Sequence, residues 1–155
     1  MPNRWLMLTT AVLIGTAIGL GAFTFVYAQG YSYVTNDPAA CANCHIMDDH
    51  FAAWSRSSHA ARAVCNDCHT PHGSLLEKYA VKAKNGFWHS FYFTTGTFPY
   101  PIRITEANQE VVEGACRDCH ASITASVDHG VPSEASGVEP LDCTRCHQYV
   151  GHMVR

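Results

Sequence analysis

The stretch Cys65-Asn66-Asp67-Cys68-His69 decides the fold, because it is one of four copies of the pattern Cys-x-x-Cys-His. The other copies are Cys41–His45, Cys116–His120 and Cys143–His147. No cysteine lies outside these motifs, and every Cys-x-x-Cys pair is followed by a histidine. Zinc sites, disulfide frameworks and thioredoxin-like redox pairs would each leave some pairs without that histidine. The pattern therefore predicts four covalently bound c-type haems, attached through Cys41, Cys44, Cys65, Cys68, Cys116, Cys119, Cys143 and Cys146.

The length of the chain limits how far apart four haems can lie. A domain of about 125 residues has a radius of gyration of about 14 Å, so the porphyrins must be neighbours and must form much of the core. Neighbouring haems pass electrons to one another, whereas haem storage or gas sensing needs only one or two sites. No segment shows sustained two-residue alternation. We therefore expect a mostly α-helical electron-transfer protein with much irregular structure and no significant sheet.

An uncharged N-terminal segment predicts a transmembrane helix. No charged residue occurs between Arg4 and Asp37. As a helix, Trp5–Ala28 would be about 36 Å long, enough to cross a hydrocarbon core of about 30 Å. The alternative is a cleaved secretory signal, since Val26-Tyr27-Ala28 is an acceptable cleavage site, although the apolar core of a signal is usually shorter. We expect a retained anchor over residues 1–33.

The anchor sets the expected location of the rest of the chain. Arg4 places the N-terminus in the cytoplasm. Residues 34–155 then form a tetrahaem domain on the periplasmic side of the cytoplasmic membrane, where haem is attached to exported chains. Gly15 and Gly19 form a GxxxG pattern through which two anchors could pair. The formal net charge of −3 gives no indication of nucleic-acid binding.

The spacing of the motif histidines suggests a duplicated two-haem unit. Successive motif histidines are 24, 51 and 27 residues apart. Two similar short steps around a long one divide the domain into two dihaem halves, of about residues 34–93 and 105–155.

Two helices are predicted between and within these halves. Ser74 and Glu77 form a capping-box pattern, so we expect a helix from there to about Phe93. A second helix is predicted from Thr105 into the third motif. Gly130–Pro140 is rich in turn-forming residues and is expected to be a loop.

The helix that follows Ser74 carries basic and aromatic residues. Lys78, Lys82 and His89 lie on one face, and aromatic residues crowd its end, at Phe87, Trp88, Phe91, Tyr92 and Phe93. This composition suits a helix at a membrane surface. It suits a helix packed on haem faces equally well, and the sequence alone leaves both interpretations open.

Each haem iron needs a second axial ligand, and the histidines outside the motifs are the first candidates. They are His50, His59, His72, His89, His129 and His152. His72 and His152 follow a motif histidine too closely to reach the opposite face of that residue's own porphyrin. If they are ligands, they bind a different haem and interlock the four groups.

The first motif offers a methionine as an alternative ligand. Met47 lies two residues after His45, on roughly the opposite side of a helix. The two side chains cannot both approach one iron from the attachment side, so one of them must turn away.

Three elements together resemble the NapC/NirT family of membrane-anchored multihaem quinol dehydrogenases. They are CHIM at Cys44–Met47, CNDCHTPH at Cys65–His72 and CTRCHQYVGHM at Cys143–Met153. With the anchor and four motifs, the resemblance covers essentially the whole chain, and the short length is most like the small subunit of cytochrome c nitrite reductase. It implies that menaquinol is oxidised at the membrane near the first haem. It also implies that electrons pass to a pentahaem catalytic subunit that reduces nitrite to ammonium.

The resemblance also implies a set of axial ligands, with the haems numbered in motif order. Met47 would bind the iron of haem 1 in place of His45. The other three haems would have histidine pairs, namely His69 with His152 at haem 2, His120 with His59 at haem 3, and His147 with His72 at haem 4.

The implied quinol site departs from the family at one position. Lys82 matches a family lysine near that site, but the acidic residue that the family has seven positions later is His89 here. A neutral histidine, with an ordinary pKa of about 6.5, can accept a quinol proton, and it could also bind the iron of haem 1. His50 and His129 match no family ligand, and we expect them to face solvent or a partner.

Two other functions stay open at this point. A quinol-oxidising protein of the same family could donate electrons to a different periplasmic multihaem reductase, such as an octahaem enzyme. A tetrahaem carrier without a quinol site would follow if the N-terminal segment were a cleaved signal. The protein that co-purifies in detergent would distinguish them.

Overall fold

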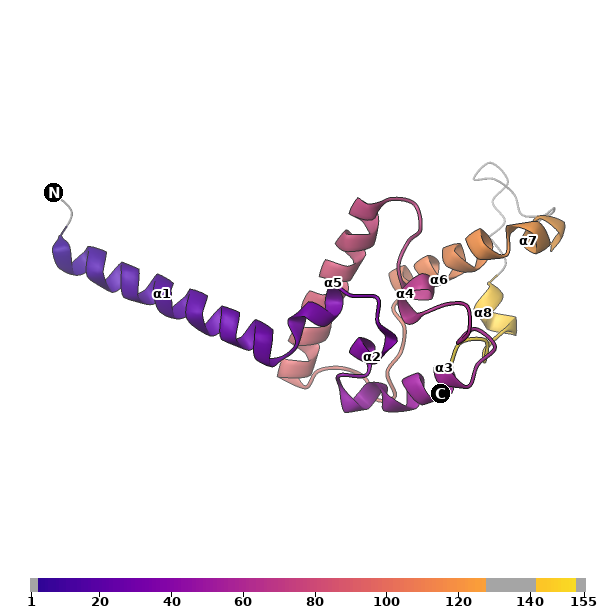
Figure 1. The fold of residues 1–155 in the computed structure, drawn as a ribbon, viewed down its shortest axis with the longest axis horizontal. Coiled ribbons are helices and arrows are strands. Elements are labelled where there is room, and N and C mark those ends of the chain that lie inside the picture. The colour runs from indigo at the N-terminus through magenta and orange to yellow at the C-terminus, as the bar shows by residue number, and fades with distance from the viewer. Residues whose placement is uncertain (1–2, 128–141, 153–155) are drawn as a thin grey trace.

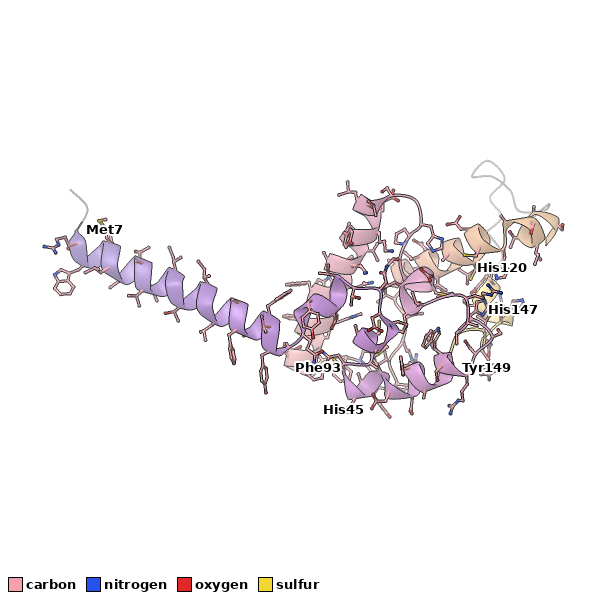
Figure 2. All side chains as sticks on the ribbon, in the orientation of Figure 1. Met7, His45, Phe93, His120, His147 and Tyr149 are labelled. Atoms are coloured by element: carbon pink, nitrogen blue, oxygen red, sulfur yellow. The ribbon has the colours of Figure 1, made fainter. Side chains whose placement is uncertain are left out.

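A long N-terminal helix projects from a domain of shorter helices (Figure 1). The computed structural model describes residues 3–127 and 142–152. Helix α1 spans Arg4–Tyr27 and begins where the Asn3 side chain accepts a hydrogen bond of 3.2 Å from the backbone N–H of Trp5. None of its residues is buried, and Figure 2 shows Met7 near the end of the helix that lies far from the domain. Because α1 is long and apolar enough to cross a bilayer, it fits a single-pass membrane anchor.

The described part of the domain is helical and contains no strand, which confirms the expected fold class. After α1 come α2, α3 and α4, with two 3₁₀ helices among them, and then α5 to α8. Their bounds are η1 Gly30–Tyr33, α2 Pro38–Cys41, η2 His45–Met47, α3 Asp48–Ser55, α4 Cys65–His69, α5 Leu75–Thr95, α6 Glu106–Cys119, α7 Ala121–Val127 and α8 Cys143–Cys146. The predicted loop over 130–140, His129 and Met153 lie outside the described residues.

The two long helices of the domain begin and end as the sequence predicts. At the start of α5, the Ser74 hydroxyl accepts a hydrogen bond from the Glu77 N–H, and the Glu77 carboxylate accepts one from the Ser74 N–H, both at 3.2 Å. Gly96 ends this helix in the left-handed conformation, with φ of 67°. Helix α6 has Thr105 as its N-cap and reaches the third motif.

The chain buries little apolar surface of its own. Ala115 is the single buried apolar residue among those that the structure describes, and the buried polar residues are Thr70, Lys82 and Glu113. Folded domains normally bury many large aliphatic side chains. The finding is consistent with the expectation that porphyrins form much of this core.

A short segment connects the anchor to the domain and packs against α5. The 3₁₀ helix η1 contacts both α1 and α5. The ring of Tyr33 lies so close to Gly86 that a Cβ atom there would be 3.2 Å from it. The absence of a side chain at Gly86 therefore lets the end of the anchor lie directly on α5.

Candidate functional site

The four motif segments pack against one another in chain order. Helix α2 contacts α4, α4 contacts α6, and α6 contacts α8. Figure 1 shows α2 on the side of the domain that faces α1, and α8 on the far side. Each of these helices contains at least one attachment cysteine of one motif. The arrangement is a continuous series of motifs that begins near the anchor.

Cysteine side chains of consecutive motifs lie next to one another. The thiols of Cys41 and Cys65 lie close enough to interact, and this interaction lowers the pKa of Cys41 to about 7 and raises the pKa of Cys65. Burial raises the pKa of Cys68, and the nearby Cys116 and Cys119 raise it further. The attachment points of the first and second motifs are therefore neighbours, as are those of the second and third.

Thr35 and Asn36 connect the first two motifs to α5. The carbonyl oxygen of Thr35 accepts hydrogen bonds from Lys82 Nζ at 2.9 Å and Asn66 Nδ2 at 3.1 Å. The side-chain oxygen of Asn36 accepts from the same two donors, at 3.1 and 3.0 Å. Asn66 belongs to the second motif, whereas Thr35 and Asn36 lead into the first. Lys82 therefore holds α5 against the junction between the two motifs.

Two pairs of histidine rings are separated by the distance that a shared iron requires. The ring centroids of His69 and His152 are 6.0 Å apart, and those of His59 and His120 are 6.1 Å apart. With metal–nitrogen bonds of about 2 Å each, an iron between two imidazoles places their centroids about 6.3 Å apart. The residues present thus fit a haem iron at each place. Both pairs are the ones that the family resemblance implies for haems 2 and 3.

The local surroundings of two of these rings also suit ligation. The Nδ1 atom of His59 lies 3.1 Å from the carbonyl oxygen of Val150, and donation to that oxygen leaves Nε2 to bind a metal. Burial lowers the pKa of His69 to about 4, and the neighbouring His152 contributes a smaller part of this shift. The side chain is nevertheless partly exposed. His69 is therefore neutral at pH 7, which is the form that binds a metal.

His50, which the sequence predicted to face solvent or a partner, is partly exposed and also contacts another histidine. Its ring packs edge-on against the ring of His152, with centroids 4.9 Å apart and an interplanar angle of 72°. His50 lies in α3, directly after the first motif, so this contact joins that part of the chain to a predicted haem 2 ligand.

The predicted pair at the fourth haem is not brought together in the same way. The Nε2 atom of His72 lies 2.7 Å from the carbonyl oxygen of Asp67, and its Nδ1 atom lies 3.5 Å from the Asp118 carboxylate. Within residues 3–127 and 142–152, no ring contact joins His72 to His147. His72 also lines two cavities of about 430 and 290 Å³. The assignment of His72 to haem 4 stays a prediction.

At the first motif, the histidine and the methionine have different surroundings. The His45 side chain is fully exposed, and its Nδ1 atom lies 3.5 Å from the Asp48 carboxylate. Figure 2 shows His45 at the outer edge of the domain. Met47 is half-buried. These surroundings favour Met47 over His45 as the ligand of haem 1, which stays a prediction.

The two predicted quinol-site residues contact the same connecting segment but not each other. His89 Nδ1 lies 3.3 Å from the hydroxyl of Tyr33, whereas Lys82 binds Thr35 and Asn36. Desolvation lowers the pKa of His89, although much of its surface is accessible, so the ring is neutral at pH 7. Burial and then the charge of Lys78 lower the pKa of Lys82.

Comparison with known proteins places the whole chain in one family. The model of the NapC/NirT cytochrome c family, N-terminal region, matches residues 1–155. The cytochrome c-type protein NrfH of Wolinella succinogenes is 34% identical over 155 residues, which cover 97% of this chain and 88% of that protein. The cytochrome c nitrite reductase subunit NrfH of Nitratidesulfovibrio vulgaris is 35% identical over 142 residues, which cover 92% of this chain and 82% of the relative.

A solved structure has the same fold. It is the crystal structure of a cytochrome c nitrite reductase NrfHA complex bound to the HQNO inhibitor, with a TM-score of 0.63 and 31% identity. The match covers 96% of this chain and 90% of the chain in that complex. Because the family model spans every residue and the two relatives match over most of their own length, this protein belongs to the NapC/NirT cytochrome c family.

Proposed function

We propose that this protein is the membrane-anchored tetrahaem subunit that takes electrons from menaquinol and delivers them to the catalytic subunit of a cytochrome c nitrite reductase. The packing of α2, α4, α6 and α8 in chain order carries the proposal, because it makes a continuous series of motifs away from the anchor. The NrfH relatives and the NrfHA complex support the partner.

The chain supplies attachment and axial ligation for each haem. Covalently bound haem c provides one-electron redox centres. The four Cys-x-x-Cys pairs hold these groups, and histidines on distant segments orient them. The proposed axial ligands are Met47 at haem 1, His69 and His152 at haem 2, His120 and His59 at haem 3, and His147 and His72 at haem 4.

The anchor places the first motif at the membrane surface. The Asn43 side chain, inside the first motif, donates a hydrogen bond of 3.4 Å to the carbonyl oxygen of Ala28, just after α1. Quinol partitions into lipid, so the motif closest to the bilayer is the one that it can reach. Arg4 at the start of the anchor favours a cytoplasmic N-terminus and therefore a periplasmic haem domain.

Quinol oxidation releases two protons together with two electrons, so a proton acceptor must lie within hydrogen-bond reach of the quinol hydroxyl. His89 is proposed as that acceptor, because its lowered pKa keeps it neutral at pH 7 and Tyr33 orients its ring. Two of the three donors of Lys82 go to Thr35 and Asn36. The third is proposed to bind the quinol oxygen.

The membrane and partner assignments are tested together by purification. We expect the protein to stay in membranes through high-salt washing, to need detergent for release because α1 spans the bilayer, and to co-purify with a pentahaem nitrite reductase. A matched variant in which a cleavable signal replaces residues 1–28 should be soluble.

Two outcomes would contradict these assignments. Recovery of the unaltered protein in the soluble fraction, with Gln29 as its first residue, would rule out the anchor. Co-purification with a different multihaem reductase would instead identify another electron acceptor.

A further inference from the structure

A buried carboxylate joins the third and fourth motifs. Glu113 lies in α6, three residues before Cys116, and only 8% of its surface is exposed. Its Oε2 atom accepts a hydrogen bond of 2.7 Å from the backbone N–H of Cys143, and its Oε1 atom accepts one of 2.9 Å from that of Thr144. Glu113 of α6, the helix of the third motif, thus holds Cys143 and Thr144, the first two residues of α8.

Neighbouring side chains strengthen the same junction. Asp142, just before α8, accepts hydrogen bonds from the Arg145 N–H at 2.9 Å and from the Thr144 hydroxyl at 2.8 Å. Gln109, one helical turn before Glu113, donates to Asp142 Oδ2 at 3.1 Å. Because residues four apart share a helix face, Gln109 and Glu113 fix residues 142–144 from the same side of α6.

The charge of Glu113 acts on the attachment cysteines of both motifs. Burial, followed by the hydrogen bond and the charge of Glu113, raises the pKa of Cys143 to about 11, against a lowering effect of Arg117. Burial and then Glu113 also raise the pKa of Cys116. Arg117 Nη1 lies 3.9 Å from the carboxylate, farther than either backbone N–H. It therefore offsets only part of the negative charge.

We propose that Glu113 is the positioning residue of the fourth haem. Its side chain fixes the fourth motif against the third, and its negative charge keeps the reduction potential of the fourth haem low. The inference rests on covalent haem at Cys143 and Cys146, which is part of the proposed function. A nearby negative charge opposes the addition of an electron. Net charge, hydrogen bonding and burial are the means by which proteins set haem potentials. A low potential at the end of the series favours onward transfer to the partner.

The substitution Glu113→Gln separates charge from shape. Glutamine has nearly the same shape, carries no charge and offers one acceptor oxygen instead of two. Glu106→Gln is the matched control, because Glu106 is an exposed residue at the start of the same helix and lies apart from the cavities that His72 lines. We expect a spectroelectrochemical titration of the full-length protein in detergent to show an upward shift of one or two of four midpoint potentials in Glu113→Gln. The Glu106→Gln protein should show no shift.

The outcomes separate this inference from the proposed function. Four retained haems with unchanged potentials in Glu113→Gln, or an equal shift of all four, would overturn the role of Glu113. If that variant loses a haem, mass spectrometry of its peptides should locate the loss at Cys143–Cys146, and a loss at another motif would overturn it too. Glu113→Asp keeps the charge, so a rise in potential as large as that of Glu113→Gln would also contradict the inference. Fewer than four covalent haems in the unaltered protein would count against the proposed function instead.

Discussion

Replacing His152 with alanine should convert one low-spin haem to the high-spin state. The ring centroids of His152 and His69 are 6.0 Å apart, close to the separation that an iron bound by both rings would require. An iron that loses one of two strong-field imidazole ligands becomes high-spin. We also expect the rate of quinol-driven electron transfer to fall at least ~10-fold, because mutating residues that only support a metal ligand already lowers activity by about 10-fold or more. Visible and EPR spectra of the purified protein measure the spin states.

His50→Ala is the matched control for this variant. It removes a ring that contacts His152 at 4.9 Å but that is not a proposed ligand. We expect it to keep the low-spin content of the unaltered protein. If His50→Ala lost a low-spin haem and His152→Ala did not, the ligand assignment would be wrong.

The angle between the rings gives each histidine pair its own EPR signal. The planes of His69 and His152 are 10° apart, whereas those of His59 and His120 are 74° apart. Near-parallel imidazole planes separate the iron dπ orbitals in energy and give a rhombic low-spin signal. Near-perpendicular planes leave those orbitals almost degenerate and give a strongly anisotropic signal. His152→Ala should therefore remove a rhombic signal, and His59→Ala an anisotropic one.

Replacing His89 with leucine should lower quinol oxidation by about 100-fold with all haems retained, because a positioned general base contributes about 10²–10⁴-fold. Desolvation lowers the pKa of His89 below its ordinary value of about 6.5. The ring is therefore neutral near pH 7, and the rate should fall only when acidification protonates it. His89→Asp should keep turnover and move this acid limb to lower pH, since an aspartate has an ordinary pKa of about 3.9. Stopped-flow reduction of the haems by a menaquinol analogue measures the pH profile.

One further variant tests the contact between Tyr33 and His89. Tyr33→Phe removes the hydroxyl that lies 3.3 Å from His89 Nδ1 but keeps the ring against Gly86. Tyr33→Phe should lower quinol oxidation less than the loss of His89 does.

Two results would contradict the proposed role of His89. Conversion of a low-spin haem to high-spin in His89→Asp would show instead that His89 is an iron ligand. Unchanged quinol oxidation in both His89→Leu and Lys82→Leu would rule out the proposed site.

The elements that the sequence predicted correctly depend on local interactions. The capping box of Ser74 and Glu77 and the N-cap at Thr105 act within one helical turn. The apolar length of α1 is likewise a property of one segment. The attachment cysteines, which stay a prediction, likewise follow from a five-residue pattern.

The rest of the candidate site depends on contacts between distant segments. No spacing rule pairs His59 with His120, whose ring centroids are 6.1 Å apart. Only the family resemblance implies that pair. The contact of His50 with His152 was not predicted, because nothing beside His50 in the chain shows that the ring of His152 lies next to it. In the sequence, Glu113 resembles any other acidic residue of an amphipathic helix. Only the folded chain brings its carboxylate to the backbone N–H groups of α8.

The central claim is that this chain carries electrons from menaquinol to a nitrite reductase. The most direct test combines the purified protein with the catalytic subunit in liposomes that contain menaquinol, and measures ammonium formed from nitrite. We expect ammonium formation that requires both the quinol and this chain and that stops with HQNO, the inhibitor bound in the similar NrfHA complex. Equal ammonium formation by the catalytic subunit alone, or rapid reduction of this chain by menaquinol without any ammonium, would contradict it.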